Sequence, residues 1–207
     1  MVGSAHALLG LALLWALPLA AGEGKPGFPQ ATPAKSVAAA KLETDDTMEK
    51  TILLRPIGIV HSPYLDAKGT PIQGIFGDQM EAWVEVQAKY VEGFRDLDGF
   101  SHAILIYHFH KSDKVEIVGQ PYLEKEPHGV FATRSPHRPN HIGLSVVRIR
   151  RIEDNRLYFT EVDVLDGTPV LDIKPYVRQF DSRTNAVSGW IEKHFRGGLR
   201  PEGKADR

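Results

Sequence analysis

The stretch from Phe131 to Leu144 holds a dense set of residues that could do chemistry: two arginines, two histidines and an asparagine, with two prolines among them. Proline fixes the φ angle and cannot donate to a sheet, so the two prolines predict a shaped loop. Arg134, Arg138 and Asn140 then offer planar hydrogen-bond donors from a stiff support. The sequence therefore predicts a loop that binds a polar ligand, one that is anionic or carries a carboxylate.

A second loop of the same kind runs from Asp163 to Tyr176. Asp166 and Gly167 form a turn signal, and two further prolines interrupt the apolar run that follows. Charged residues such as Asp172 and Lys174 in so apolar a segment are normally paired or used in a site. A hairpin with solvated charges is the alternative for this loop alone, but the two loops together predict a site.

Three histidines, His102, His108 and His110, share parity on one predicted strand and should project from one face. A His-x-His pair on a barrel strand can hold zinc or iron, and a third ligand could come from His128, His137 or His141. No acidic residue stands at a telling spacing. Histidines beside aromatic residues more often line a pocket and bind a ligand or the backbone, so we predict no metal.

The formal net charge of −1 provides no global attraction to nucleic acid, so a local basic patch would have to provide it. Arg148 and Arg150 share a face by strand alternation, with Arg151 beside them. Such a surface could contact phosphates, but it could equally be a solvated strand face beside Glu153 and Asp154. The chain has no cysteine, which excludes disulfides and thiolate chemistry.

The N-terminal part separates into two segments. Residues 1–21 contain an apolar run that resembles a secretory signal, although no positive charge precedes it, and residues 22–50 have the composition of a disordered linker. Met48 is a plausible start because the strand-like pattern begins directly after it. We expect a cytoplasmic protein if translation starts at Met48, an exported protein if the apolar segment is a true signal, and no stable membrane anchor.

Short strands with Gly/Pro turns dominate the rest of the chain. Strand patterns are predicted at residues 52–61, 82–88, 103–109, 129–133, 144–152 and 157–164, with a helical turn at 90–97 and a short helix at 187–195. Many short strands and little helix indicate a mainly β protein with one compact β-barrel. We assign the barrel to residues 51–182, followed by a C-terminal helix and tail at 183–207.

Four blocks of the sequence closely resemble the TrmO (TsaA-like) family, in which a tRNA is methylated with S-adenosylmethionine. They are Pro56–Tyr64 (PIGIVHSPY), Gly99–His102 (GFSH), the run Gly129–Pro136 (GVFATRSP) with Arg138–Asn140 (RPN) and Ile142–Ser145 (IGLS), and Asp166–Tyr176 (DGTPVLDIKPY). The resemblance implies a β-barrel, a homodimer, and a substrate: threonylcarbamoyl-adenosine beside the anticodon of tRNA, methylated on its exocyclic nitrogen.

The resemblance also implies site residues. The family's cofactor contacts correspond to Ile72, Gln73, Gly74, His110, Lys111, Arg134, Leu144, Asp163, Val164, Leu165 and Asp166. His110 or Asp166 could remove the proton from the acceptor nitrogen, and the sequence does not choose between them. Arg138, Asn140, Lys174 and Tyr176 are candidates for substrate binding.

Three positions depart from the family pattern. Ile72 stands where a basic residue is frequent, Lys111 where an uncharged polar residue is common, and His141 where proline is usual. The last departure alters the central loop and bears on the identity of the substrate. Two other functions stay open: a metal-dependent barrel enzyme that uses His108 and His110, and a noncatalytic barrel that binds an adenosyl ligand.

Overall fold

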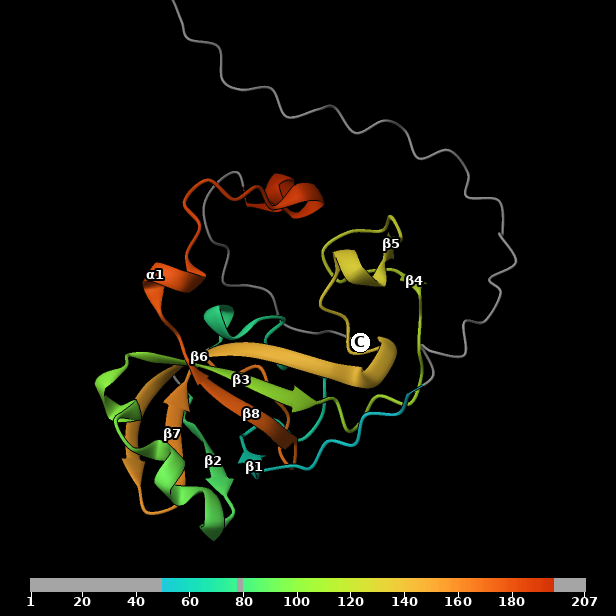
Figure 1. Cartoon of the computed structure of the whole chain (residues 1–207). Coiled ribbons are helices and arrows are strands. Elements are labelled where there is room, and N and C mark those ends of the chain that lie inside the picture. The colour runs from blue at the N-terminus through green and yellow to red at the C-terminus, as the bar shows by residue number, and fades with distance from the viewer. Residues whose placement is uncertain (1–49, 78–79, 196–207) are drawn as a thin grey trace, which may run out of the picture. The chain divides into compact units, whose positions relative to one another are not determined.

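Six antiparallel strands close into a barrel in the computed structural model, which describes residues 50–77 and 80–195. Around the barrel, the order is β1 (Gly58–His61), β2 (Ala82–Val86), β7 (Arg156–Thr160), β6 (Ile142–Glu153), β3 (His102–His108) and β8 (Pro169–Pro175), and β8 pairs again with β1 (Figure 1). Closure leaves no free sheet edge, which protects a small all-β domain from edge-to-edge pairing.

The remaining elements are short. β4 (Val118–Gly119) and β5 (His128–Gly129) form a two-stranded sheet, and α1 (Arg178–Asp181) is a single turn. The 3-10 helices are η2 (Gly74–Phe76), η3 (Ala88–Phe94), η4 (Leu97–Gly99), η5 (Val130–Ala132), η6 (Pro139–His141) and η7 (Gly189–His194). Within the described ranges, no helix is long and apolar enough to span a membrane.

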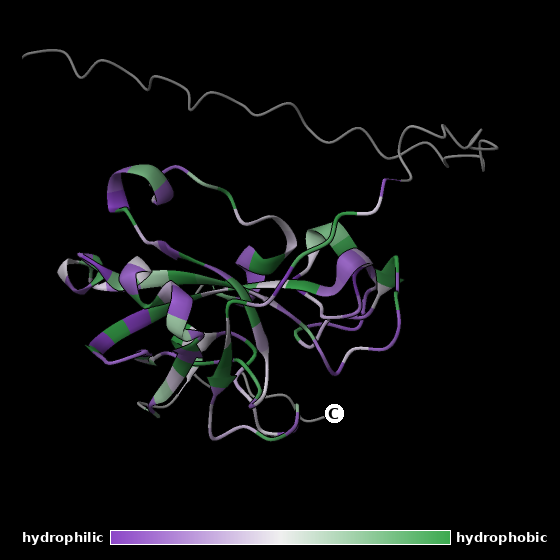
Figure 2. Ribbon diagram, turned by 60° about the horizontal axis from the view of Figure 1, so that its bottom comes forward, coloured by the Kyte–Doolittle hydropathy of each residue, from purple (hydrophilic) through white to green (hydrophobic). Residues whose placement is uncertain are grey.

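Alternation along the strands builds the core. Buried and partly exposed residues alternate strictly in β2 and β3. Figure 2 shows hydrophobic and hydrophilic residues mixed along the barrel strands. The largest fully buried side chains are Phe159, Leu105, Leu157, Val60, Val84, Val147, Val162, Val164 and Val170. Each contributes about 1.5–3 kcal/mol relative to an exposed side chain.

The structure confirms the predicted fold class. It corrects several boundaries, and the largest correction is at residues 129–133, where only His128–Gly129 form a strand before the chain turns into η5. The first predicted strand shortens to β1, and the predicted C-terminal helix is the 3-10 helix η7. The signal-like segment 1–21, the linker up to residue 49 with Met48, and the tail after residue 195 lie outside the described residues.

Candidate functional site

The carboxylate of Asp163 joins three segments at one end of the barrel. Ser145 Oγ on β6 donates to Asp163 Oδ1 at 2.5 Å, and the backbone N–H of Gly74 in η2 donates to Asp163 Oδ2 at 2.9 Å. Tyr107 Oη on β3 lies 3.0 Å from Ser145 Oγ, which extends the chain of hydrogen bonds into the barrel. Both oxygens of this carboxylate therefore bind the protein itself.

Local sequence explains why these groups meet. Gly143, Ser145 and Val147 all point inward on β6, so a hydroxyl stands among core residues and needs a partner. Gly74 can approach because it lacks a side chain: a Cβ at this position would lie 1.9 Å from the carbonyl oxygen of Glu161. The glycine is thus required for the close approach of η2 to the end of β7.

Burial dominates the electrostatics of this cluster. Asp163 keeps part of its surface open, but its carboxyl group is surrounded by protein atoms, and this desolvation raises its pKa to about 6 despite the hydrogen bonds from Ser145 and Gly74. Burial, followed by the charge of Asp163, raises the pKa of Tyr107. The phenol therefore stays neutral, while the carboxyl group titrates near physiological pH.

Arg134 extends from the predicted binding loop to η2. Its guanidinium Nη1 donates to the side-chain oxygen of Gln73 at 2.6 Å, and Gln73 Nε2 donates to the carbonyl of Ile72 at 2.7 Å. Arg134 is exposed, and its acceptor is a neutral amide. The guanidinium is thus held in place while its charge is left available to a ligand.

Asp166 forms a second group of contacts three residues after Asp163. Its Oδ1 accepts a hydrogen bond from the backbone N–H of Ser62 at 3.1 Å and lies 3.9 Å from Nδ1 of His61. Ser62 Oγ donates to the carbonyl of Val164, whose side chain belongs to the core. The side chain of Asp166 is 40% exposed, so this carboxylate is open to a ligand.

His110 lies beside this second group, past the end of β3. Its Nδ1 is 3.2 Å from Thr168 Oγ1. Burial, with the nearby positive charge of Lys111, lowers the pKa of His110, while Asp166 acts in the opposite direction. The imidazole is therefore neutral at pH 7 and can accept a proton. Lys111 itself donates to the carbonyl of Leu65.

The two groups are linked by a short segment of chain. From Asp163 to Asp166 the backbone can span at most about 10 Å. The structure thus brings together Gln73, Gly74, Arg134, Asp163, Val164, Leu165, Asp166, His110 and Lys111 at one end of the barrel. Leu144 is 46% exposed and precedes the buried Ser145, so its side chain faces outward.

The substrate-binding candidates are divided between two places. Arg138 donates to the carbonyl of Thr133 at 3.1 Å, and Asn140 adopts a positive φ of 62°, so both shape the same loop as Arg134. Lys174 pairs with Asp172 at 2.6 Å, and the N–H of Tyr176 donates to the carbonyl of His102 at 3.0 Å.

Lys174 and Tyr176 therefore lie beside the start of β3, whereas His110 follows its end. The six steps from His102 to His108 measure roughly 20 Å. The four substrate-binding candidates thus lie in two places along the barrel.

The histidines of β3 lie on the outer face of the barrel. His102 and His108 point outward on β3, and His108 meets His141 edge-on with 6.0 Å between ring centroids. In the part of the chain that the structure describes, no three His, Asp or Glu residues are placed to hold a metal ion.

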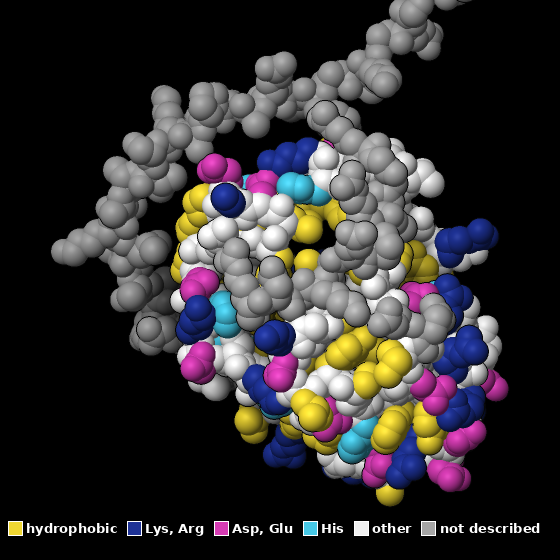
Figure 3. All heavy atoms as spheres, turned by 180° about the vertical axis from the view of Figure 1, so that it is seen from behind, with side chains coloured by type: hydrophobic (Ala, Val, Ile, Leu, Met, Phe, Trp, Pro, Cys, Tyr) yellow, Lys and Arg dark blue, Asp and Glu magenta, His cyan; other side chains and the backbone are white. Residues whose placement is uncertain are grey.

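The predicted basic surface on β6 is matched by carboxylates. Arg148 pairs with Glu161 at 2.8 Å, and Arg151 pairs with Glu81 at 2.5 Å and with Glu153 at 2.9 Å. On the face seen in Figure 3, basic and acidic side chains are interspersed. The contacts of Arg148 and Arg151 thus favour the solvated strand face over a phosphate-binding patch.

The match to known proteins follows this geometry. Residues 59–182 match the model of the tRNA-methyltransferase O N-terminal domain. The chain belongs to this family. It is 52% identical over 143 residues to a Pyrococcus abyssi protein named "Probable S-adenosyl-L-methionine-binding protein", covering 69% of this chain and 78% of that protein.

Two further relatives carry more specific names. The human tRNA (adenine(37)-N6)-methyltransferase is 35% identical over 166 residues, with 77% of this chain and 36% of the human protein covered. The crystal structure of TrmO from Pseudomonas aeruginosa superposes with a TM-score of 0.59 at 36% identity, covering 68% of this chain and 63% of that one. The chain thus spans about a third of the human protein and less than two thirds of the bacterial one.

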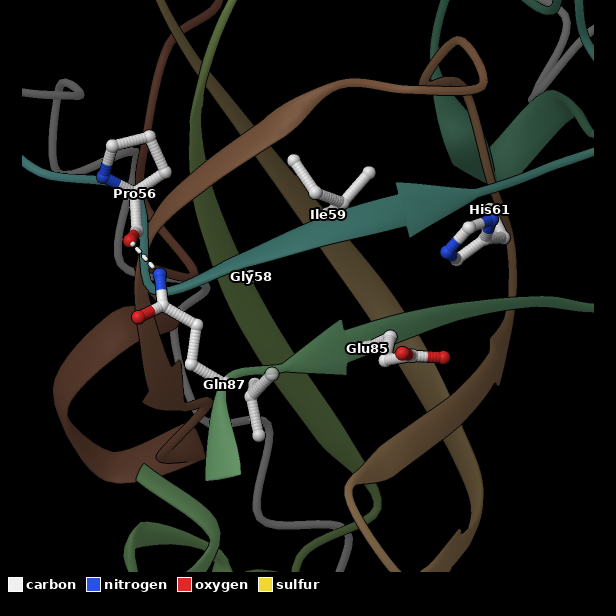
Figure 4. Close-up of a pocket in the computed structure, with 7 residues that line it drawn as sticks. Pro56, Gly58, Ile59, His61, Glu85 and Gln87 are labelled. Atoms are coloured by element: carbon white, nitrogen blue, oxygen red, sulfur yellow. Dashed lines mark hydrogen bonds between the residues drawn. The ribbon is translucent and has the colours of Figure 1, made fainter. Parts of the chain in front are cut away.

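A hollow elsewhere on the barrel does not coincide with the site of this TrmO-family chain. It lies between β1 and β2 and is lined by Pro56, Gly58, Ile59, His61, Glu85, Val86 and Gln87, with Gln87 Nε2 donating to the carbonyl of Pro56 at 2.8 Å (Figure 4). His61 connects this hollow to Asp166, with 3.9 Å between His61 Nδ1 and Asp166 Oδ1.

Sequence reasoning missed three contributors to the site. Ser145 and Tyr107 complete the Asp163 cluster, and Thr168 contacts His110. Ser145 had a signal, because it is a hydroxyl at an inward position among the apolar residues at the start of β6. Thr168 had none, since its role depends on where β3 ends.

Proposed function

We propose that the chain is an S-adenosylmethionine-dependent methyltransferase that acts on tRNA, and that its target is the exocyclic nitrogen of threonylcarbamoyl-adenosine beside the anticodon. Membership in the family supports the reaction class. The observation that carries the proposal is the charge of Arg134, which is held by the amide of Gln73. Arg148, Arg151 and Arg156, by contrast, each pair with a glutamate.

The donor set suits the cofactor. S-adenosylmethionine carries a carboxylate, an ammonium group and ribose hydroxyls, and Arg134 is the natural partner for the carboxylate. Asp166, with its open oxygen, suits the ammonium group or a ribose hydroxyl. Asp163 is the less available of the two carboxylates, because its carboxyl group is surrounded by protein atoms and Ser145 and Gly74 each donate to one of its oxygens. We therefore assign Asp163 to positioning.

When bound, the cofactor supplies an electrophilic methyl group on a sulfonium. The task of the protein is alignment, because an in-line displacement depends on holding the acceptor nitrogen in a near-attack geometry. That nitrogen is a poor, urea-like nucleophile and must lose a proton as the new N–C bond forms. His110 is the better base of the two candidates, since its lowered pKa keeps it neutral. The carboxylate of Asp166 then stabilises the imidazolium that results.

Recognition of the tRNA has two parts in this proposal. Arg138 and Asn140, in the loop of Arg134, contact the threonyl carboxylate or a neighbouring phosphate. Lys174 and Tyr176, roughly 20 Å away along the barrel, contact the RNA at a distance from the methylated base.

We also propose a homodimer. Ile142 and Leu144 are 38% and 46% exposed on the outer face of β6, opposite His108 and Ile106 of β3, which face the same way. Large apolar side chains at such a surface suit burial against a second copy of the chain. Sedimentation of the wild type and of Ile142→Asp tests this: a dimer that becomes a monomer supports it, and a monomeric wild type contradicts it.

Transfer of a labelled methyl group tests the function. The substrates are tRNA that carries threonylcarbamoyl-adenosine and the same tRNA without this modification, and we expect label only in the first. Arg134→Ala should lower cofactor affinity at least tenfold, while Arg95→Ala, an exposed arginine paired with Glu92, should leave it unchanged. Label in the unmodified tRNA would refute threonylcarbamoyl-adenosine as the target of methylation. Cofactor binding without any transfer would instead indicate a noncatalytic binding protein.

A further inference from the structure

The C-terminal segment Gly189–Phe195 lies outside residues 59–182, which match the family domain, but it contacts both loops of the candidate site. At one end, Trp190 Nε1 donates to the carbonyl of Ala132 at 2.9 Å, two residues before Arg134. At the other end, Phe195 stacks on Phe76 with ring centroids 5.8 Å apart, three residues after Gln73.

A partly exposed ring stack and a shared carboxylate fix the first end. Trp190 stacks on His128 with centroids 4.3 Å apart and planes 13° from parallel. Glu124, whose side chain is 9% exposed, accepts hydrogen bonds from His128, from Lys193 and, at 3.1 Å, from Nε2 of His194. These three donors lower the pKa of Glu124 to about 2, with Lys193 the largest cause and His128 the next.

The result is a closed ring of contacts around the cofactor loops. η2 and the loop of Arg134 are joined directly by the bond between Gln73 and Arg134, and a second time through the C-terminal segment. The direct bond is a single exposed hydrogen bond, so on its own it restricts the two loops only weakly. The second connection adds two stacked ring pairs and a hydrogen bond from Trp190, and it therefore restricts the separation of the two loops more than the direct bond alone.

We infer that Gly189–Phe195 is a positioning strap, in which Trp190 and Phe195 hold the loops of Arg134 and Gln73 at the separation that cofactor binding requires. The inference rests on the proposed function for its ligand, but the strap itself is a property of the free protein. Neither residue touches the reacting atoms. The strap acts through Arg134 and Gln73, and the cost of ordering these two side chains is met before the ligand binds.

Hydrogen–deuterium exchange of the full chain without ligand gives the first test. The reporters are the amides of Gly74, Phe76 and Gly77, which bond to Asp163, Gln73 and Gly74. Trp190→Ala removes the anchor at the far end of the strap, and we expect faster exchange at residues 73–77. Phe180→Ala removes an aromatic ring that is 70% exposed nearby in sequence, and it should change nothing there. Faster exchange confined to residues 128–134 would overturn the strap.

Calorimetric titration with S-adenosylmethionine gives the second test. Trp190→Ala and Phe195→Ala should each weaken binding about tenfold, and the double variant should be no weaker than either, because losing one anchor already releases the strap. Trp190→Phe, which retains a ring to stack on His128, should recover part of the loss. Additive losses, or single variants within twofold of wild type, would overturn the inference. A wild type that binds no S-adenosylmethionine would refute the proposed function, while the exchange result would still decide the strap.

Discussion

Asp163→Asn tests the description of the buried cluster most directly. Raising the pKa of a carboxyl group from 3.8 to about 6 corresponds to about 3 kcal/mol, at 1.36 kcal/mol per pH unit. Because the folded-state pKa is raised, this stability is fully present below pH 3.8 and is lost as the pH rises through about 6. Part of the surface of Asp163 is open to water, so the measured loss should be about 1.5–3 kcal/mol.

Asparagine reproduces the protonated form of this residue. Its amide oxygen can accept from the N–H of Gly74, and its NH₂ can donate to Ser145 Oγ, whose hydroxyl then turns toward Tyr107. The variant should therefore match the wild type at pH 4 and exceed its free energy of unfolding by about 1.5–3 kcal/mol at pH 8. Urea unfolding at a series of pH values measures this.

Two outcomes of that series would refute the reasoning. A variant that is less stable than wild type at pH 8 would mean that the ionised carboxylate gains more from Ser145 and Gly74 than it loses by burial. A difference that does not change between pH 4 and pH 8 would mean that Asp163 does not titrate in this window. Glu124 does not confuse the comparison: its pKa is lowered to about 2, so its contribution to stability falls as the pH drops below 4.5, but it does so equally in both proteins and cancels in the difference.

Two further predictions address the neighbours of this cluster. Gly74→Ala should lower the free energy of unfolding by about 2 kcal/mol or more and weaken cofactor binding, because its Cβ would lie 1.9 Å from the carbonyl oxygen of Glu161. Gly93→Ala is the control, since a Cβ there meets nothing within 4 Å. Equal stabilities of the two variants would contradict the close approach at Gly74. The pH–rate profile should show an acid limb below pH 6.5 from protonation of His110. Lys111→Ala should move that limb to higher pH, because it removes a positive charge that lowers the pKa of His110. A limb that stays in place would contradict His110 as the base.

Much of the fold follows from the strand-forming residues of the sequence, and the errors have physical causes. β2, β3 and the hairpin of β6 and β7 lie within two residues of their predicted starts, because each is rich in β-branched, aromatic and other apolar residues. β8 was missed because prolines stand at both ends of it, yet the first residue of a strand is a position where proline is tolerated. Residues 129–133 resemble a strand in composition, but β5 ends at Gly129 after its short pairing with β4, and the chain then turns into η5.

The candidate site could be predicted as a set of residues but not as a set of roles. Asp163 and Gly74 are 89 residues apart, and no local pattern says that one accepts a hydrogen bond from the other. The position of Lys174 and Tyr176 could not be predicted either, because their distance from His110 depends on the register of β8 against β3.

The segment from Asp163 to Asp166 shows why one short motif serves two purposes. The side chain of Val164 packs into the core, and its carbonyl accepts a hydrogen bond from Ser62 Oγ. These two contacts fix the segment across the end of the barrel. On one side of Val164, the carboxylate of Asp163 accepts hydrogen bonds from Gly74 in η2 and from Ser145 on β6. On the other side, the carboxylate of Asp166 accepts a hydrogen bond from Ser62 in the loop after β1, and its side chain is 40% exposed. One buried valine thus separates two aspartates that look alike in the sequence, one whose carboxyl group is enclosed by protein atoms and one whose side chain is 40% exposed.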